Sequence, residues 1–160
     1  MSDALFVPPI RPGEIPGPSR EIFAVMGEEN IYRMLEAFYL ELDHASTPLR
    51  ALFPVDMVSA SRKSAAFFVG LLGGPPRYQE RYGNPMMRAR HLPFAITDDR
   101  RREWLACFER VLDRAVSEFD FPVVHLAGFR RFLEGFSAWM VNRQQAPTDG
   151  TRADEHGALS

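Results

Sequence analysis

Cysteine is nearly absent from this sequence, since Cys107 is the one cysteine among 160 residues. No disulfide can therefore form within the chain, which suits a protein of the reducing cytoplasm. Long apolar runs are also missing, and none reaches the roughly 18 residues that a membrane-spanning helix needs. The first residues lack the basic and apolar segments of a secretory signal. We therefore expect a cytoplasmic protein without a membrane partner.

The chain carries no large excess of either charge. Its formal net charge is -2 and its pI is about 6.1, which gives no electrostatic basis for binding nucleic acid. Positive charge comes almost entirely from arginine, because Lys63 is the single lysine. A chain of 160 residues suits one domain with a substantial buried core.

Both ends of the chain lack the pattern of regular structure. Residues 1–18 hold several prolines and are expected to form an extended arm, in which Leu5, Phe6 and Val7 are suited to cover the core or a partner. Residues 144–160 combine Gly, Pro and charge with few apolar side chains, as a flexible tail does. The remaining residues, 19–143, form the expected domain.

Between these ends, apolar residues recur three or four positions apart, as in amphipathic helices. The pattern predicts a short helix that stops at Gly27, followed by main helices over about 30–42 and 58–72. A third main helix follows Thr97, a favourable N-cap with acidic residues after it, and a fourth follows Pro122. No strand pattern competes, so the predicted fold class is all-α.

The segment from Gly73 to Ile96 is too rich in Gly and Pro for one regular element, and only Met86 to Arg90 is expected to be helical. His91 then lies at the end of one helical turn. A neutral imidazole there can bind a metal. A lone histidine does not define a metal site, however, and a structural role is the alternative.

The same segment resembles the proximal region of the truncated haemoglobins, specifically their second group. The matching residues are Gly73-Gly74-Pro75, Tyr78, Gly83-Asn84-Pro85 and the run from Met87 to Ile96, with Trp104-Leu105-Ala106-Cys107 after it and Phe38-Tyr39 before it. The similarity covers roughly residues 20 to 143.

That resemblance implies a two-over-two helical sandwich that encloses haem b. The haem would be held non-covalently, because the chain has no Cys-x-x-Cys-His motif. His91 would be the proximal axial ligand of the iron and leave the opposite face open to a diatomic ligand. Tyr39 would donate a hydrogen bond to that ligand, and Trp104 would line the distal pocket. Plain core packing is the alternative for both aromatic residues.

The resemblance also assigns residues to the edge and face of the haem. A basic residue at the position of Lys63 pairs with a propionate in the family, although an ordinary solvated lysine is the alternative. Arg90 and Tyr78 are further propionate candidates. Phe53 packs on the haem face, and Phe94 keeps its expected place after His91.

The distal wall departs from related sequences. Ala60 stands where classical globins carry a distal histidine, and no histidine occurs between residues 45 and 90. Ser64 lies deeper in the pocket, where its hydroxyl either faces the ligand or bonds back to its own helix. Several relatives have tyrosine at the position of Phe53. With Tyr39, Trp104 and Ser64 as donors, we expect slow release of dioxygen.

Three classes of function remain open. The first is a haem protein that binds dioxygen, carbon monoxide or nitric oxide, either as an oxygen carrier or store or in nitric oxide or redox detoxification. Nitric oxide dioxygenation would require a separate reductase, because the chain shows no reductase module. Only weak peroxidation is expected, because no acid-base residue maps to the distal wall. The second class is a haem-based sensor or electron-transfer module that acts through a partner. The third is a haem-free helical binding protein. The sequence does not indicate an oligomeric state.

Overall fold

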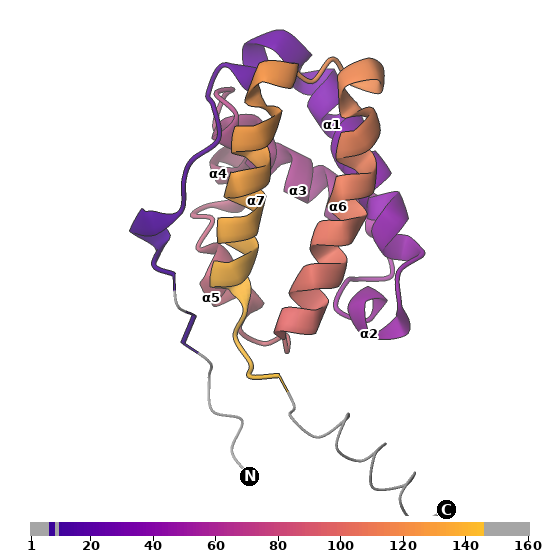
Figure 1. Ribbon diagram of the computed structural model, residues 1–160, viewed down its shortest axis with the longest axis vertical. Helices are drawn as coiled ribbons and strands as arrows, with labels where there is room; N and C mark the ends of the chain where they lie inside the picture. The colour runs from indigo at the N-terminus through magenta and orange to yellow at the C-terminus, as the bar shows by residue number, and fades with distance from the viewer. Residues whose placement is uncertain (1–6, 9, 146–160) are drawn as a thin grey trace, which may run out of the picture.

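The computed structural model describes residues 7, 8 and 10–145, and every regular element within them is helical (Figure 1). The α-helices are α1 (Ile22–Asp43), α2 (Thr47–Arg50), α3 (Met57–Leu71), α4 (Arg77–Tyr82), α5 (Met87–His91), α6 (Asp98–Glu118) and α7 (Leu126–Met140), with 3-10 turns η1 (Pro12–Glu14) and η2 (Val123–His125). Helices α1 and α3 pack together, as do α6 and α7, and α1 also contacts α6. The predicted all-α, two-over-two architecture is confirmed.

An aromatic cluster joins the two helix pairs. The rings of Phe38 from α1 and Phe108 from α6 stack with centroids 4.1 Å apart. Phe68 from α3 and Phe129 from α7 complete the cluster, and both of their rings lie within 6.0 Å of Phe108. All four side chains are buried. Burial of large aromatic rings at the crossing point stabilises both layers at once.

The predicted helix boundaries are largely observed. Thr97 caps α6, since its hydroxyl accepts a hydrogen bond from the Arg100 amide, and Asp56 caps α3 by accepting from the Ser59 amide. Gly27 has φ 80° and ψ 161° and interrupts the long helix α1 with a kink. The expected stop at Gly27 is therefore present as a local break.

The prediction for the loop from Gly73 to Ile96 was wrong in one respect. In addition to α5, this segment forms the helix α4, which begins directly after Pro76. Pro76 has non-helical angles and serves as the N-cap, so the two prolines precede the helix and do not break it. Helix α2 was also missed. Pro48 is the second residue of this helix, where a proline is tolerated.

The arm contacts the outer side of α7. Ile15 packs against the core cluster, and a Cβ built on Gly135 of α7 would meet Ile10, Ile15 and Pro16 at 3.3–3.5 Å. Among the described residues of the arm, only η1 is helical, and Val7 is 83% exposed. Leu5 and Phe6 lie outside the described residues, as does the tail from residue 146 onward. No helix in the part of the chain that the structure describes is long and apolar enough to cross a membrane.

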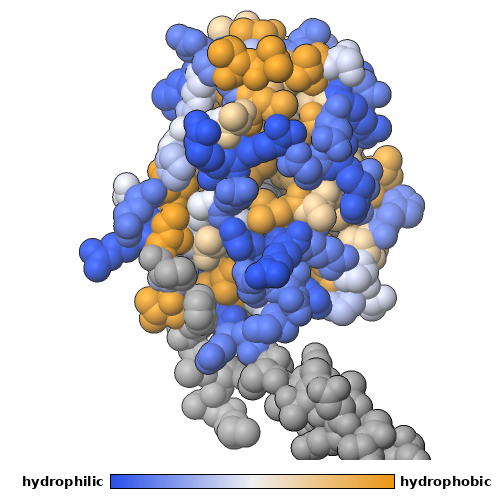
Figure 2. All heavy atoms as spheres, in the orientation of Figure 1, coloured by the Kyte–Doolittle hydropathy of each residue, from blue (hydrophilic) through white to orange (hydrophobic). Residues whose placement is uncertain are grey.

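Hydrophilic residues cover much of the face that carries α6 and α7, whereas hydrophobic residues gather at the end where α6 passes into α7 (Figure 2). Val123 and Val124 of η2 lie in this connection and are 70% and 78% exposed.

Candidate functional site

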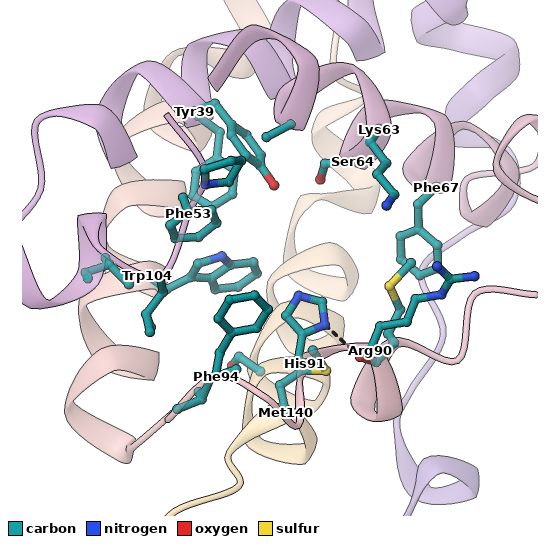
Figure 3. A pocket seen from close by; sticks show the side chains of 18 of the residues that line it. Tyr39, Phe53, Lys63, Ser64, Phe67, Arg90, His91, Phe94, Trp104 and Met140 are labelled. Atoms are coloured by element: carbon teal, nitrogen blue, oxygen red, sulfur yellow. Dashed lines mark hydrogen bonds between the residues drawn. The ribbon is translucent and has the colours of Figure 1, made fainter. Parts of the chain in front are cut away.

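A cavity of about 540 Å³ opens between the two helix pairs and the loop that carries α5. All ten residues that the sequence analysis selected line this cavity, which brings together segments far apart in the chain (Figure 3). These residues are Tyr39, Phe53, Ala60, Lys63, Ser64, Tyr78, Arg90, His91, Phe94 and Trp104.

His91 enters the cavity from the end of α5. Its Nδ1 lies 2.6 Å from the carbonyl oxygen of Met87, one turn earlier in the same helix. Because a carbonyl can only accept, Nδ1 carries the proton and Nε2 keeps its lone pair. Burial lowers the pKa of His91, the hydrogen bond to Met87 opposes this, and the positive charge of Lys63 lowers the pKa further. The imidazole is therefore neutral near pH 7, as a metal ligand must be.

Tyr39 faces the same cavity from α1, on the side opposite His91 (Figure 3). Burial raises the pKa of its phenol, and a hydrogen bond with the Ser64 hydroxyl partly opposes this rise. The phenol therefore keeps its proton at neutral pH. Ser64 also lines the cavity, beside the Tyr39 phenol.

Aromatic rings form the wall beside Tyr39. The Phe53 ring meets the Tyr39 ring edge-on at 5.7 Å. Trp104 packs against Phe38 in the same manner at 5.3 Å, and Phe94, which is 43% exposed, closes the cavity below Trp104 (Figure 3). Ala60 adds only a methyl group to this wall. The wall thus excludes water along a flat, apolar surface.

Positive charge is concentrated at the opposite edge of the cavity. The Lys63 ammonium lies 5.1 Å from the centre of the Tyr82 ring. Arg90 donates to the carbonyl oxygens of Tyr82 and Asn84 at 2.7–3.2 Å, and its guanidinium lies over the ring of buried Tyr78. These contacts hold two cationic groups at the rim, on the same side of His91 (Figure 3).

The sequence analysis missed several lining residues on α3, α6 and α7. Phe67, Phe136 and Met140 extend the apolar wall. Arg101 ties α6 to α7, because it donates to the Ser137 hydroxyl at 3.1 Å and to the Glu134 carbonyl at 3.2 Å. Phe136 and Met140 lie four residues apart, a helical spacing that is typical of core residues. Periodicity alone does not distinguish a core from a cavity wall.

Two charged lining residues were also missed. Asp56 is an acidic group on the cavity wall, but its carboxylate caps α3. Arg100 lines the cavity with a buried Nε that has no hydrogen-bond partner among the described residues. Nothing in the sequence distinguishes Arg100 from Arg101 and Arg102, which follow it directly.

This donor set fits haem. A single neutral imidazole facing an apolar cavity supplies one axial ligand to a metal whose other ligands come from a macrocycle. Flat aromatic walls match the faces of such a ring, and Lys63 and Arg90 match its carboxylate edge. The fold and the cavity together define a haem-binding globin.

Comparisons with known proteins agree with this class. The model of the bacterial-like globin family matches residues 22–132. The chain is 42% identical over 129 residues to the group 2 truncated hemoglobin YjbI of Bacillus subtilis, covering 78% of this chain and 90% of the relative. It also resembles the crystal structure of phosphate-bound Hell's gate globin IV, with a TM-score of 0.74, 32% identity and coverage of 83% and 81% of the two chains. A third match is the X-ray structure of the truncated oxygen-avid haemoglobin from Bacillus subtilis, with a TM-score of 0.64, 35% identity and coverage of 75% and 98%.

The chain therefore belongs to the bacterial-like globins, and within them to the group II truncated haemoglobins.

Proposed function

We propose that this globin holds haem b non-covalently through His91 and reversibly binds dioxygen, carbon monoxide or nitric oxide on the Tyr39 side of the cavity. The observation that carries the proposal is the placement of a basic imidazole nitrogen and a phenol hydroxyl on opposite sides of one apolar cavity. The name of one similar structure describes that relative as oxygen-avid, which supports dioxygen as the ligand.

Haem held by His91 would supply an iron atom that can take a diatomic ligand. His91 is prepared for this role by its hydrogen bond to Met87, which fixes the tautomer and holds the ring relative to its own helix α5. Tyr39 donates its proton toward a ligand on its side of the cavity. Ser64 lies beside the phenol, and its hydroxyl lowers the pKa of Tyr39 against the effect of burial.

The edge residues retain and orient the haem. Lys63 and Arg90 would pair with the propionates, and Tyr78 supports Arg90 through the face of its ring. Phe53, Ala60 and Phe94 would contact the macrocycle, while Trp104 shields the ligand position from water. This arrangement suits an oxygen carrier or store, or a protein that removes nitric oxide with electrons from a separate reductase.

Tyr39→Phe tests the proposal through the rate of dioxygen release. The variant keeps the ring and its contact with Phe53 but loses the donor hydroxyl. Loss of a hydrogen bond to a polar ligand costs about 1.5–3 kcal/mol, so the dissociation rate should rise roughly 10- to 150-fold. Stopped-flow displacement of dioxygen by carbon monoxide measures this rate.

Tyr32→Phe is the matched control for this experiment. Tyr32 lies on the same helix but does not line the cavity, and its hydroxyl accepts from Arg81 at 3.3 Å. Its removal should leave the dissociation rate unchanged. An off-rate that Tyr39→Phe does not alter would contradict the proposed role of the phenol.

A further inference from the structure

Asn142 follows the end of α7 and is fully buried, with 0% of its surface exposed. Its Nδ2 donates to the carbonyl oxygens of His91 at 3.1 Å and of Phe94 at 2.9 Å. Its Oδ1 accepts from the amide of Ile96 at 2.9 Å. The two carbonyls can only accept and the amide can only donate, so the amide group of Asn142 has one possible orientation.

Backbone contacts place this side chain. The amides of Asn142 and Arg143 both donate to the carbonyl of Ile96, at 3.0 and 3.2 Å. The segment after α7 is therefore fastened along the turn that follows His91, and the Asn142 side chain fills the space inside that turn.

Contacts in the opposite direction come from Arg88, three residues before His91. Its guanidinium donates to the carbonyls of Trp139 and Val141 at 2.6 and 2.7 Å. These carbonyls belong to the last residues of α7 and the residue after it. The end of α7 and the helix that carries His91 thus bind each other from both sides of the histidine.

Helix α5 needs such support, because it has only five residues. A helix of this length is not stable by itself. Its N-cap, Met86, has φ 39° and lies in the left-handed region, where a residue other than glycine is strained. The orientation of His91 therefore depends on contacts from outside α5.

We propose that Asn142 is a positioning residue for His91 and that it sets the orientation of the imidazole by holding the carbonyl of His91 itself. The inference rests on the proposed function, because it takes His91 to be the axial ligand. It gives Asn142, which does not line the cavity, a role in positioning the axial ligand.

Asn142→Asp tests this role in the full chain reconstituted with haem. The substitution keeps the shape of the side chain and an acceptor for the Ile96 amide, but it removes both donors to His91 and Phe94. Gln145→Glu is the matched control, since it makes the same chemical change at a residue whose Oε1 accepts from the Asp99 amide, away from the turn of His91.

Two readouts separate positioning of the ligand from stability alone. The iron–histidine stretching band in the resonance Raman spectrum of the ferrous, ligand-free protein reports the orientation of the imidazole. Haem transfer to excess apomyoglobin reports how well the axial bond is held. We expect Asn142→Asp to shift or split the band and to raise the rate of haem loss by about tenfold or more, whereas Gln145→Glu leaves both at their wild-type values.

A wild-type band and a wild-type rate of haem loss in Asn142→Asp would overturn the inference, even if its melting temperature fell. If Asn142→Asp does not fold, Arg88→Lys decides by the same readouts, because it keeps the charge but cannot span both carbonyls of α7. Absence of an iron–histidine band in the wild type would instead contradict the proposed role of His91.

Discussion

A hydrogen bond within α5 prepares His91 for its role. Donation from Nδ1 to the Met87 carbonyl leaves Nε2 as the basic nitrogen, and burial keeps the ring neutral. On the other side of the cavity, burial keeps the Tyr39 phenol protonated, although the contact with Ser64 lowers the phenol pKa and partly opposes this effect. Each of these groups is thus held in the protonation state that the proposed chemistry requires.

The residues that the sequence selected from linear motifs all line the cavity. His91 and its neighbours lie in such a motif, and Tyr39 and Trp104 occur in two shorter ones. Asn142 has no motif around it, and its importance comes from three partners 46 to 51 positions away in the chain. Such partners become visible only when the fold is known.

Lys63→Met tests the proposed propionate contact. Lys63 is exposed, and an exposed ion pair contributes about 0.2–1 kcal/mol, so the rate of haem loss should rise by no more than about fivefold. The increase should shrink at high salt, which screens such pairs. Haem transfer to apomyoglobin at low and high ionic strength measures both effects.

Arg62→Met is the control for Lys63→Met. Arg62 neighbours Lys63 on α3 but lies over the Tyr32 ring and does not line the cavity. Equal effects of the two substitutions would show that Lys63 acts only through the general charge of the helix.

The main helices that the sequence predicted correctly have a long amphipathic pattern, whereas the short helix α5 was expected from the prolines on either side of it. Helices α1, α3, α6 and α7 each have 15 residues or more, so their apolar faces repeat over several turns. Helices α2 and α4 have four and six residues, which is too short for a periodicity to be recognised. Their prolines were interpreted as helix breakers, although a proline at the start of a helix favours it.

The connection between α3 and α4 depends on Gly73. This residue has φ +106°, and a Cβ added to it would lie 1.9 Å from the carbonyl oxygen of Arg20. The carbonyl oxygen belongs to the backbone, and the position of the Cβ is fixed by the backbone of residue 73. A small side-chain movement therefore cannot relieve the clash. Gly73→Ala should therefore lower the free energy of unfolding by about 2–4 kcal/mol, measured by urea denaturation of the holoprotein.

Gly83→Ala separates the clash from the backbone angle. Gly83 has φ +82°, but a Cβ there would meet nothing within 4 Å. Its substitution should cost only about 1–2 kcal/mol, the cost of a left-handed conformation. If Gly73→Ala lowered the free energy of unfolding no more than Gly83→Ala does, the result would contradict the close approach of the Arg20 carbonyl to this turn.

At the scale of the whole molecule, the helix pairs provide opposite sides of the cavity. Helix α1 carries Tyr39, α3 carries Ser64 and Lys63, and α6 carries Trp104, while the loop between α3 and α6 carries His91. The resemblance alone predicted this arrangement. The position of the arm against α7 could not be predicted from the sequence, because Ile10 and Ile15 occur without a recognisable pattern.

Deletion of residues 1–18 tests whether the arm contributes to ligand binding. We propose that the domain of residues 19–143 binds haem and ligand without it. Loss of the partly buried Ile15 should lower the free energy of unfolding by roughly 1–2 kcal/mol. The dioxygen dissociation rate should stay within about twofold of wild type, because the arm packs outside α7 and distant sites act independently.

A variant lacking residues 146–160 is the parallel control for a general effect of shortening the chain. A large change in dioxygen release on deletion of the arm alone would favour the sensor or electron-transfer role, in which the arm reports on the haem to a partner.

The visible absorption spectrum of the purified protein tests whether the chain binds haem through His91. It is recorded in the ferric, dithionite-reduced and carbon monoxide-bound states, for the wild type and for His91→Ala. His44→Ala is the control, because His44 has the same contact of Nδ1 with a carbonyl four residues earlier, at 2.9 Å, but does not line the cavity. We predict a haem spectrum with a carbon monoxide shift that His44→Ala preserves and that His91→Ala loses or strongly alters. A folded wild-type protein that takes up no haem, or identical spectra for His91→Ala and wild type, would contradict the account.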